Sequence, residues 1–128
     1  KKRFAKRRAM SFRVADGHRL PFKNKEFDAV FCLEAMEHVE DPRLVISEIR
    51  RVLADDGYII VLVPSENLFF RLGWPVWTAT YGKVWRGTHL HKFSADQIVS
   101  LIKKSGFRVV RNHKFILGML QLVKARKK

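Results

Sequence analysis

The chain has 128 residues, of which 47% are hydrophobic and 12% aromatic. This length and apolar content suit one domain with a single core and exclude a disordered chain. No apolar run reaches the roughly 18 residues that a membrane-spanning helix needs. The one cysteine, Cys32, can form no disulfide within the chain, which fits a reducing compartment. We therefore expect a single domain over residues 1–128, without a transmembrane segment and located in the cytoplasm.

The formal charge of +14 is unevenly distributed. Seven basic residues and no acid lie within the first thirteen residues, and nine more basic residues follow Asp96, again without an acid. Ten of the twelve acids lie between Asp16 and Asp56. The basic ends could attract an anionic partner such as RNA. Solvated surface charge is the preferred interpretation, because no signature of a nucleic-acid-binding module accompanies the basic residues.

The apolar pattern predicts several strands. Residues 1–10 are compatible with a basic helix, and residues 12–15 are a short strand candidate. Residues 27–32 (FDAVFC) and 58–63 (YIIVLV) are near-continuous apolar runs, typical of strands covered on both faces. Two further segments, 107–115 and 116–125, predict a terminal antiparallel hairpin.

The first predicted helix lies between the two apolar runs. Asp41 is suited to cap its N-terminus, and Pro42 is suited to its first position. Apolar residues at helical spacing follow, so the helix is expected over residues 41–54, with Gly57 as its C-cap.

The second predicted helix begins at a capping box formed by Ser94 and Gln97. Phe93 and Ile98 are placed to form its hydrophobic staple, and the helix should stop at Gly106. The alternation of strands and helices predicts an α/β fold of three layers with parallel strands. Ligands of such folds bind beyond the carboxyl ends of the strands, which directs attention to residues 16–18, 33–38 and 64–67.

Four segments resemble successive motifs of class I S-adenosylmethionine-dependent methyltransferases. They are FRVADGHRLPF (12–22), EFDAVFCLEAMEHVEDP (26–42), EIRRVLADDGYIIVLVPSEN (48–67) and GTHLHKFSADQIVSLIKKSGF (87–107). The motifs are closest to those of quinone-biosynthesis O-methyltransferases. The resemblance implies a Rossmann-like fold, a mostly parallel sheet with a C-terminal antiparallel hairpin, and S-adenosylmethionine as cofactor. It implies methyl transfer to an oxygen of a small or lipid-like molecule.

The seven glycines of the chain nowhere form the glycine-rich cofactor loop of that family. The resemblance therefore implies that the family's first strands and this loop are missing. In the family these strands lie in the middle of the sheet. Either the chain is part of a longer protein, or the strands at 12–15 and 27–32 pair abnormally. We expect the chain alone to bind cofactor poorly and to be inactive.

The resemblance assigns roles to individual residues. Asp16 and Gly17 match the turn that recognises adenine, and Leu33 would lie against the cofactor. His38 is the candidate base that removes a proton from the acceptor, with Glu34 in support. His89, in GTH, matches the quinone-pathway enzymes and is the third candidate catalytic residue.

Glu34, Glu37 and His38 form an E-x-x-E-H pattern, whose side chains would point to one side of a helical turn. Two carboxylates and an imidazole suit Mg²⁺ or Mn²⁺, and His91 could supply a fourth ligand. A metal would lower the pKa of an acceptor hydroxyl. The alternative, which we prefer, is that the two carboxylates are solvated and that only His38 faces the site, where it acts without a metal.

The segment at residues 68–85 holds all three tryptophans and could cover a large aromatic or lipid-like substrate. Local packing onto the core is an equal alternative. Two other functions stay open: a metal-dependent RNA 2′-O-methyltransferase, favoured by the charge and His91, and a non-catalytic binding module with this fold. His18 and His113 carry no motif support and are expected at the surface.

Overall fold

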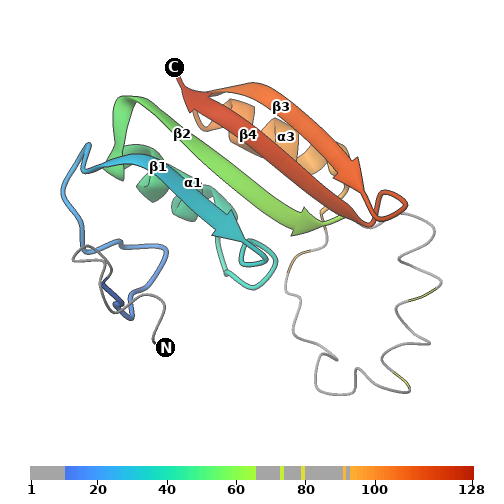
Figure 1. Ribbon diagram of the computed structural model, residues 1–128. Helices are drawn as coiled ribbons and strands as arrows, with labels where there is room; N and C mark the ends of the chain where they lie inside the picture. The colour runs from blue at the N-terminus through green and yellow to red at the C-terminus, as the bar shows by residue number, and fades with distance from the viewer. Residues whose placement is uncertain (1–10, 66–72, 74–78, 80–90, 92) are drawn as a thin grey trace, which may run out of the picture.

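The computed structural model describes residues 11–65, 73, 79, 91 and 93–128. The described elements are β1 (Phe27–Leu33), α1 (Pro42–Val52), β2 (Leu53–Pro64), α3 (Ala95–Lys104), β3 (Phe107–Phe115) and β4 (Leu120–Lys127). The strands form one sheet in the order β1-β2-β4-β3 (Figure 1). Residues 1–10, for which a helix is predicted, lie outside the described part.

The strand pairings agree with the predicted topology. β1 and β2 are parallel neighbours, with Ala29 opposite Tyr58 and Leu33 opposite Leu62, and α1 connects them. This confirms the predicted pair of parallel strands joined by a helix. β4 is antiparallel to both β2 and β3, which confirms the terminal hairpin. The described strands therefore form a mixed sheet of the Rossmann-like type.

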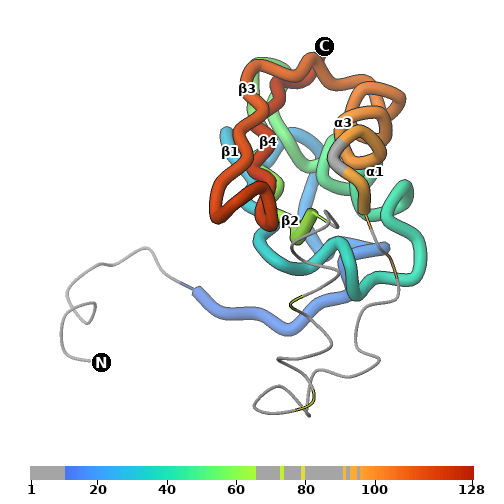
Figure 2. The backbone as a smooth tube through the Cα atoms, turned by 90° about the vertical axis from the view of Figure 1, so that its right-hand side faces the viewer, coloured from blue at the N-terminus to red at the C-terminus, as the bar shows by residue number. Residues whose placement is uncertain are grey.

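Both described helices cover the same face of the sheet (Figure 2). The core between helices and sheet is built from apolar side chains that are at least nine-tenths buried, among them Val45, Ile46, Ile49, Ile59, Val61, Val63, Ile98, Ile102, Phe107 and Val123. The described residues thus supply two of the three predicted layers. Phe31 and Leu33, on the opposite face of β1, remain 58% and 53% exposed, so within these residues β1 is not covered on both faces as predicted.

The start of α1 follows the prediction and its end does not. The Asp41 side chain accepts hydrogen bonds from the backbone N–H groups of Arg43 (2.9 Å) and Leu44 (3.3 Å), which confirms the N-cap. The helix ends at Val52, and the C-cap residue Leu53 has an extended backbone that begins β2 directly. Gly57 is therefore not the C-cap; a Cβ there would lie 3.0 Å from the carbonyl oxygen of Ala54, so close backbone approach requires glycine.

Helix α3 has the predicted boundaries. The Gln97 Oε1 accepts a 2.8 Å hydrogen bond from the Ser94 backbone N–H, as the capping box requires. Phe93 and Ile98 both belong to the core. Gly106 follows the helix with φ +83°, and a Cβ there would lie 2.7 Å from Arg50 Nε. The left-handed conformation therefore favours glycine at this position, whereas the flexible Arg50 side chain could move aside for a Cβ.

The predicted strand at residues 12–15 is wrong. These residues form no strand, and Phe12 and Val14 are almost fully exposed. A strand is held by hydrogen bonds to a neighbouring strand. Among the described residues no strand runs beside this segment, and the Arg13 side chain instead donates to the Pro21 carbonyl oxygen (3.2 Å).

Candidate functional site

The candidate site begins where β1 ends. Leu33 is the last residue of the strand and is 53% exposed. Glu34 follows in the left-handed region, with φ +50°, while its backbone N–H donates to the Leu62 carbonyl oxygen (2.9 Å). This conformation costs energy for a residue other than glycine and is often found at functional sites. It turns the chain out of the sheet and into the loop at residues 34–40.

This loop buries one carboxylate and exposes one imidazole. Met36 and Glu37 are 0% and 1% exposed, whereas the His38 side chain is 34% exposed. A turn holds them, with the His38 N–H donating to the Ala35 carbonyl oxygen (3.1 Å). The His38 Nε2 lies 4.0 Å from Glu37 Oε1. The histidine therefore reaches the surface with a buried carboxylate beside it.

The buried carboxylate influences its neighbours. Glu37 Oε2 is buried and has no hydrogen-bond partner among the described residues. The pKa of Glu34 is raised, first by its partial burial and then by Glu37, while His38 lowers it. Burial, followed by the charge of Glu37, raises the pKa of the Cys32 thiol to about 11. Glu34, Glu37 and His38 thus lie near one another at the end of β1.

The predicted adenine turn is fixed by a residue to which the sequence analysis gave no role. Asp16 Oδ1 accepts hydrogen bonds from the His18 backbone N–H (2.9 Å) and lies 2.7 Å from His18 Nδ1. The other ring nitrogen of His18 is 3.1 Å from the backbone nitrogen of Asp41, the N-cap of α1. The turn is therefore attached to the helix that follows His38. The pattern Asp-x-His was an available signal, because an Asp side chain commonly bonds the backbone two residues on.

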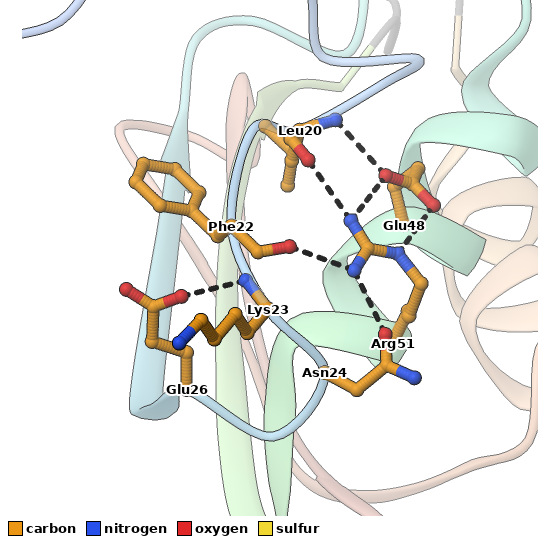
Figure 3. Close-up of polar contacts among 7 residues, drawn as sticks. All are labelled: Leu20, Phe22, Lys23, Asn24, Glu26, Glu48 and Arg51. Atoms are coloured by element: carbon orange, nitrogen blue, oxygen red, sulfur yellow. Dashed lines mark hydrogen bonds and ion pairs between the residues drawn. The ribbon is translucent and has the colours of Figure 1, made fainter.

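A second network fastens the next part of the loop to α1 (Figure 3). The Arg51 guanidinium donates to both oxygens of Glu48 (2.8 Å each). It also donates to the carbonyl oxygens of Leu20 (2.9 Å) and Phe22 (2.8 Å) and to the side chain of Asn24 (2.9 Å). The Leu20 backbone N–H donates a 2.9 Å hydrogen bond to Glu48. Arg51 thereby supports a segment that has no strand pairing of its own.

His91 lies against the loop of His38. Its backbone N–H donates to the Glu37 carbonyl oxygen (3.0 Å), and its ring Nε2 is 3.1 Å from the Glu40 carbonyl oxygen. His89, the other candidate from this motif, lies outside the described residues, as does the aromatic segment apart from residues 73 and 79.

The metal prediction gains no support from the described side chains. Among the residues that the structure describes, no group of three or more His, Cys, Asp or Glu residues is placed to hold a metal ion. Ligation by Glu34, Glu37, His38 and His91 remains a prediction.

In the same part of the chain, no helix is long and apolar enough to cross a membrane.

Comparison with known sequences finds methyltransferases among the relatives of the chain. Residues 1–61 match the family model described as a methyltransferase domain. The chain is 30% identical, over 94% of its length and 55% of the relative, to a ubiquinone/menaquinone biosynthesis C-methyltransferase, UbiE, of Desulfotalea psychrophila. It is 30% identical, over 77% of its length and 50% of the relative, to a demethylmenaquinone methyltransferase of Thermotoga maritima. The chain thus spans about half the length of these relatives.

Comparison with solved structures supports the fold. An S-adenosylmethionine-dependent methyltransferase from Thermotoga maritima superposes with a TM-score of 0.72 at 22% identity, over 89% of this chain and 62% of that one. The fold and the loops at its strand ends define a Rossmann-like α/β domain with a site beyond the parallel strands. Together with the sequence matches, they support a class I S-adenosylmethionine-dependent methyltransferase.

Proposed function

We propose that this chain forms part of an enzyme that transfers a methyl group from S-adenosylmethionine to a hydroxyl-bearing, quinol-like small molecule. One observation carries the proposal above all. The predicted adenine turn at Asp16 is joined through His18 to Asp41, three residues beyond His38. A cofactor-binding turn and a candidate base are therefore held at one end of the sheet by a single set of contacts.

The described residues fit the adenosyl part of the cofactor. Asp16 Oδ1 is occupied by His18, while Oδ2 makes no hydrogen bond to any described residue. The Asp16 side chain is 67% exposed, so Oδ2 can accept from the adenine amino group. Gly17 supplies a backbone N–H beside it for a ring nitrogen. Leu33, exposed at the end of β1, offers an apolar surface to the cofactor.

The proposed chemistry needs only alignment and removal of one proton. The sulfonium of S-adenosylmethionine supplies an activated methyl group. His38 would accept the proton of the acceptor hydroxyl as that group attacks. The Glu37 carboxylate, 4.0 Å from His38 Nε2, would favour the imidazolium that results. Burial strengthens this effect, because less water screens the two charges.

The acceptor atom is either oxygen or ring carbon. The resemblance favours an oxygen, whereas one relative is named a C-methyltransferase. Both reactions of a hydroxylated ring begin with loss of the same hydroxyl proton, so His38 would have the same role in each. Demethylmenaquinol is the acceptor to test first. Mass spectrometry would detect the added methyl group, and NMR would place it on carbon or oxygen.

The test compares His38→Ala with His113→Ala in the natural full-length protein. His113 is exposed on β3, away from the proposed site, and serves as the matched control. Removing a general base should slow transfer by about 10²–10⁴ with little change in cofactor affinity. The control should keep wild-type activity. Equal activity of the His38 variant and the control would contradict the proposal.

The two alternative functions, an RNA 2′-O-methyltransferase and a non-catalytic binding module, predict different results in assays of binding and methyl transfer. An RNA 2′-O-methyltransferase would methylate small RNA, with binding that weakens steeply as salt is raised. A binding module would hold S-adenosylhomocysteine without methylating any acceptor. The prediction that the 128-residue chain alone binds cofactor poorly is tested beside them, by calorimetry on this chain and on the full-length protein.

A further inference from the structure

His18 joins the cofactor turn to the start of α1. It is half-buried, with 22% of its side chain exposed, while the Asp16 side chain beside it is 67% exposed. One ring nitrogen faces Asp16 and the other faces the backbone of Asp41.

The contacts determine where the ring carries its proton. The backbone N–H of Asp41 can only donate, so His18 Nε2 must accept at 3.1 Å. In the neutral ring the proton then lies on Nδ1, which donates to Asp16 Oδ1 at 2.7 Å. A charge-assisted bond of this kind is short and directional. His18 is thereby held as one tautomer between a fixed donor and a carboxylate.

The same bonds orient the carboxylate of Asp16. Oδ1 accepts from both the backbone N–H and the ring of His18, so the side chain cannot rotate freely. These bonds also lower the pKa of Asp16, the backbone bond most, which keeps the group ionised. The turn lies beside α1, where a Cβ on Gly17 would be in ordinary van der Waals contact with Val45 at 3.5 Å.

We propose that His18 is a positioning residue that holds Asp16 for recognition of the adenine amino group, and so sets the preference for adenine over hypoxanthine. The inference rests on the proposed function. Hypoxanthine has a carbonyl in place of the amino group, and an ionised carboxylate cannot accept a hydrogen bond from it. An oriented Asp16 therefore both favours adenine and disfavours hypoxanthine.

The test measures binding of S-adenosylhomocysteine and S-inosylhomocysteine to the full-length protein by calorimetry. His18→Phe keeps a ring and removes both ring hydrogen bonds. It should weaken binding of the adenine ligand about tenfold and change binding of the inosine ligand less than about twofold. His18→Asn can still donate to Asp16 and should recover part of the preference. His113→Phe should bind both ligands as the wild type does.

Ring-nitrogen NMR of the wild type supplies an independent readout, with Nδ1 protonated and Nε2 accepting. The opposite tautomer would overturn the inference. An equal loss of affinity for both ligands in His18→Phe would also overturn the inference, because it indicates only a structural role. Unchanged affinity for both ligands in this variant would overturn it as well. If wild-type protein binds neither ligand, the proposed function fails, and the inference fails with it. Binding by wild type with an unchanged ligand ratio in His18→Phe overturns the inference alone.

Discussion

The backbone N–H of His91 donates a 3.0 Å hydrogen bond to the carbonyl oxygen of Glu37. The His91 ring adds a second attachment, 3.1 Å from the Glu40 carbonyl oxygen. The segment that leads into α3 is thus fastened to the loop that carries His38. Because the first bond uses only the backbone N–H, it survives any substitution at position 91 other than proline.

This relationship predicts a small effect of His91→Gln. The backbone bond keeps the loop in place, so the transfer rate should fall less than about threefold, whereas loss of a metal ligand would cost 10-fold to 100-fold or more. Steady-state kinetics with and without added Mn²⁺ would measure the difference. A large, Mn²⁺-sensitive loss would support the metal-ligand prediction instead. Asp96→Asn, on the exposed first turn of α3, is the control.

Glu37→Gln should separate stability from activity. Glu37 is 1% exposed, and in the part of the chain that the structure describes its Oε2 lacks a hydrogen-bond partner. Burying a neutral amide costs less than burying an ionised carboxylate, so the variant should gain about 1 kcal/mol in free energy of unfolding at pH 7. It should lose roughly tenfold in transfer rate, because the negative charge near His38 is gone.

Denaturant unfolding and steady-state kinetics would measure the two effects of this substitution. Glu40→Gln, an exposed residue on the same loop, is the matched control and should change neither. A variant of Glu37 that is less stable and equally active would show that its carboxylate has a structural role alone.

Arg51→Lys should loosen the loop that precedes β1. Lysine keeps the charge but cannot bond Glu48, Leu20, Phe22 and Asn24 together, as the planar guanidinium does. We expect the melting temperature to fall by several degrees and binding of S-adenosylhomocysteine to weaken. Arg43→Lys, exposed on the same helix, should leave both unchanged. An unchanged melting temperature in Arg51→Lys would show that the hydrogen bonds of Arg51 do not stabilise the fold.

Cys32 should contribute a fall in stability at alkaline pH. Its pKa is raised from 9.0 to about 11 in the folded protein, by burial first and by Glu37 second. Between these values the unfolded state has lost the proton and the folded state still holds it. The free energy of unfolding should therefore decrease from pH 9 towards pH 11, by about 1–3 kcal/mol in total.

The control for this pH dependence is Cys32→Ala, which retains the titration of every lysine and tyrosine. Unfolding by urea at several pH values would show a shallower decline in the variant than in the wild type. Identical declines would mean that the thiol ionises equally in both states.

Prediction from sequence succeeded where the signal was local or strongly apolar. Asp41 and Pro42 mark the start of α1 because capping depends on neighbouring residues alone. The apolar run at 58–63 is the centre of β2. The prediction of a strand at residues 12–15 failed because a strand needs a neighbouring strand to pair with, which no local pattern reveals. The prediction of Gly57 as a C-cap failed because this glycine allows a close approach to the backbone of Ala54 and does not end a helix.

The candidate site was only partly accessible from sequence. The motifs located Asp16 and the Glu34–His38 pattern, but gave no indication that Glu37 is buried while His38 is exposed. His18 was expected to be a surface residue, and its contact with Asp41 could not be foreseen because it joins positions 23 apart in the chain. The role of Arg51 was similarly hidden, because its partners other than Glu48 belong to a loop of no regular structure.

The central claim is that the Asp16 turn and the loop of His38 form one methyl-transfer site. A crystal structure of the full-length protein with S-adenosylhomocysteine tests it most directly. The account predicts the adenine amino nitrogen within about 3 Å of Asp16 Oδ2, with the sulfur of the ligand facing the loop of His38. Adenine bound elsewhere, or a sulfur turned away from His38, would contradict it.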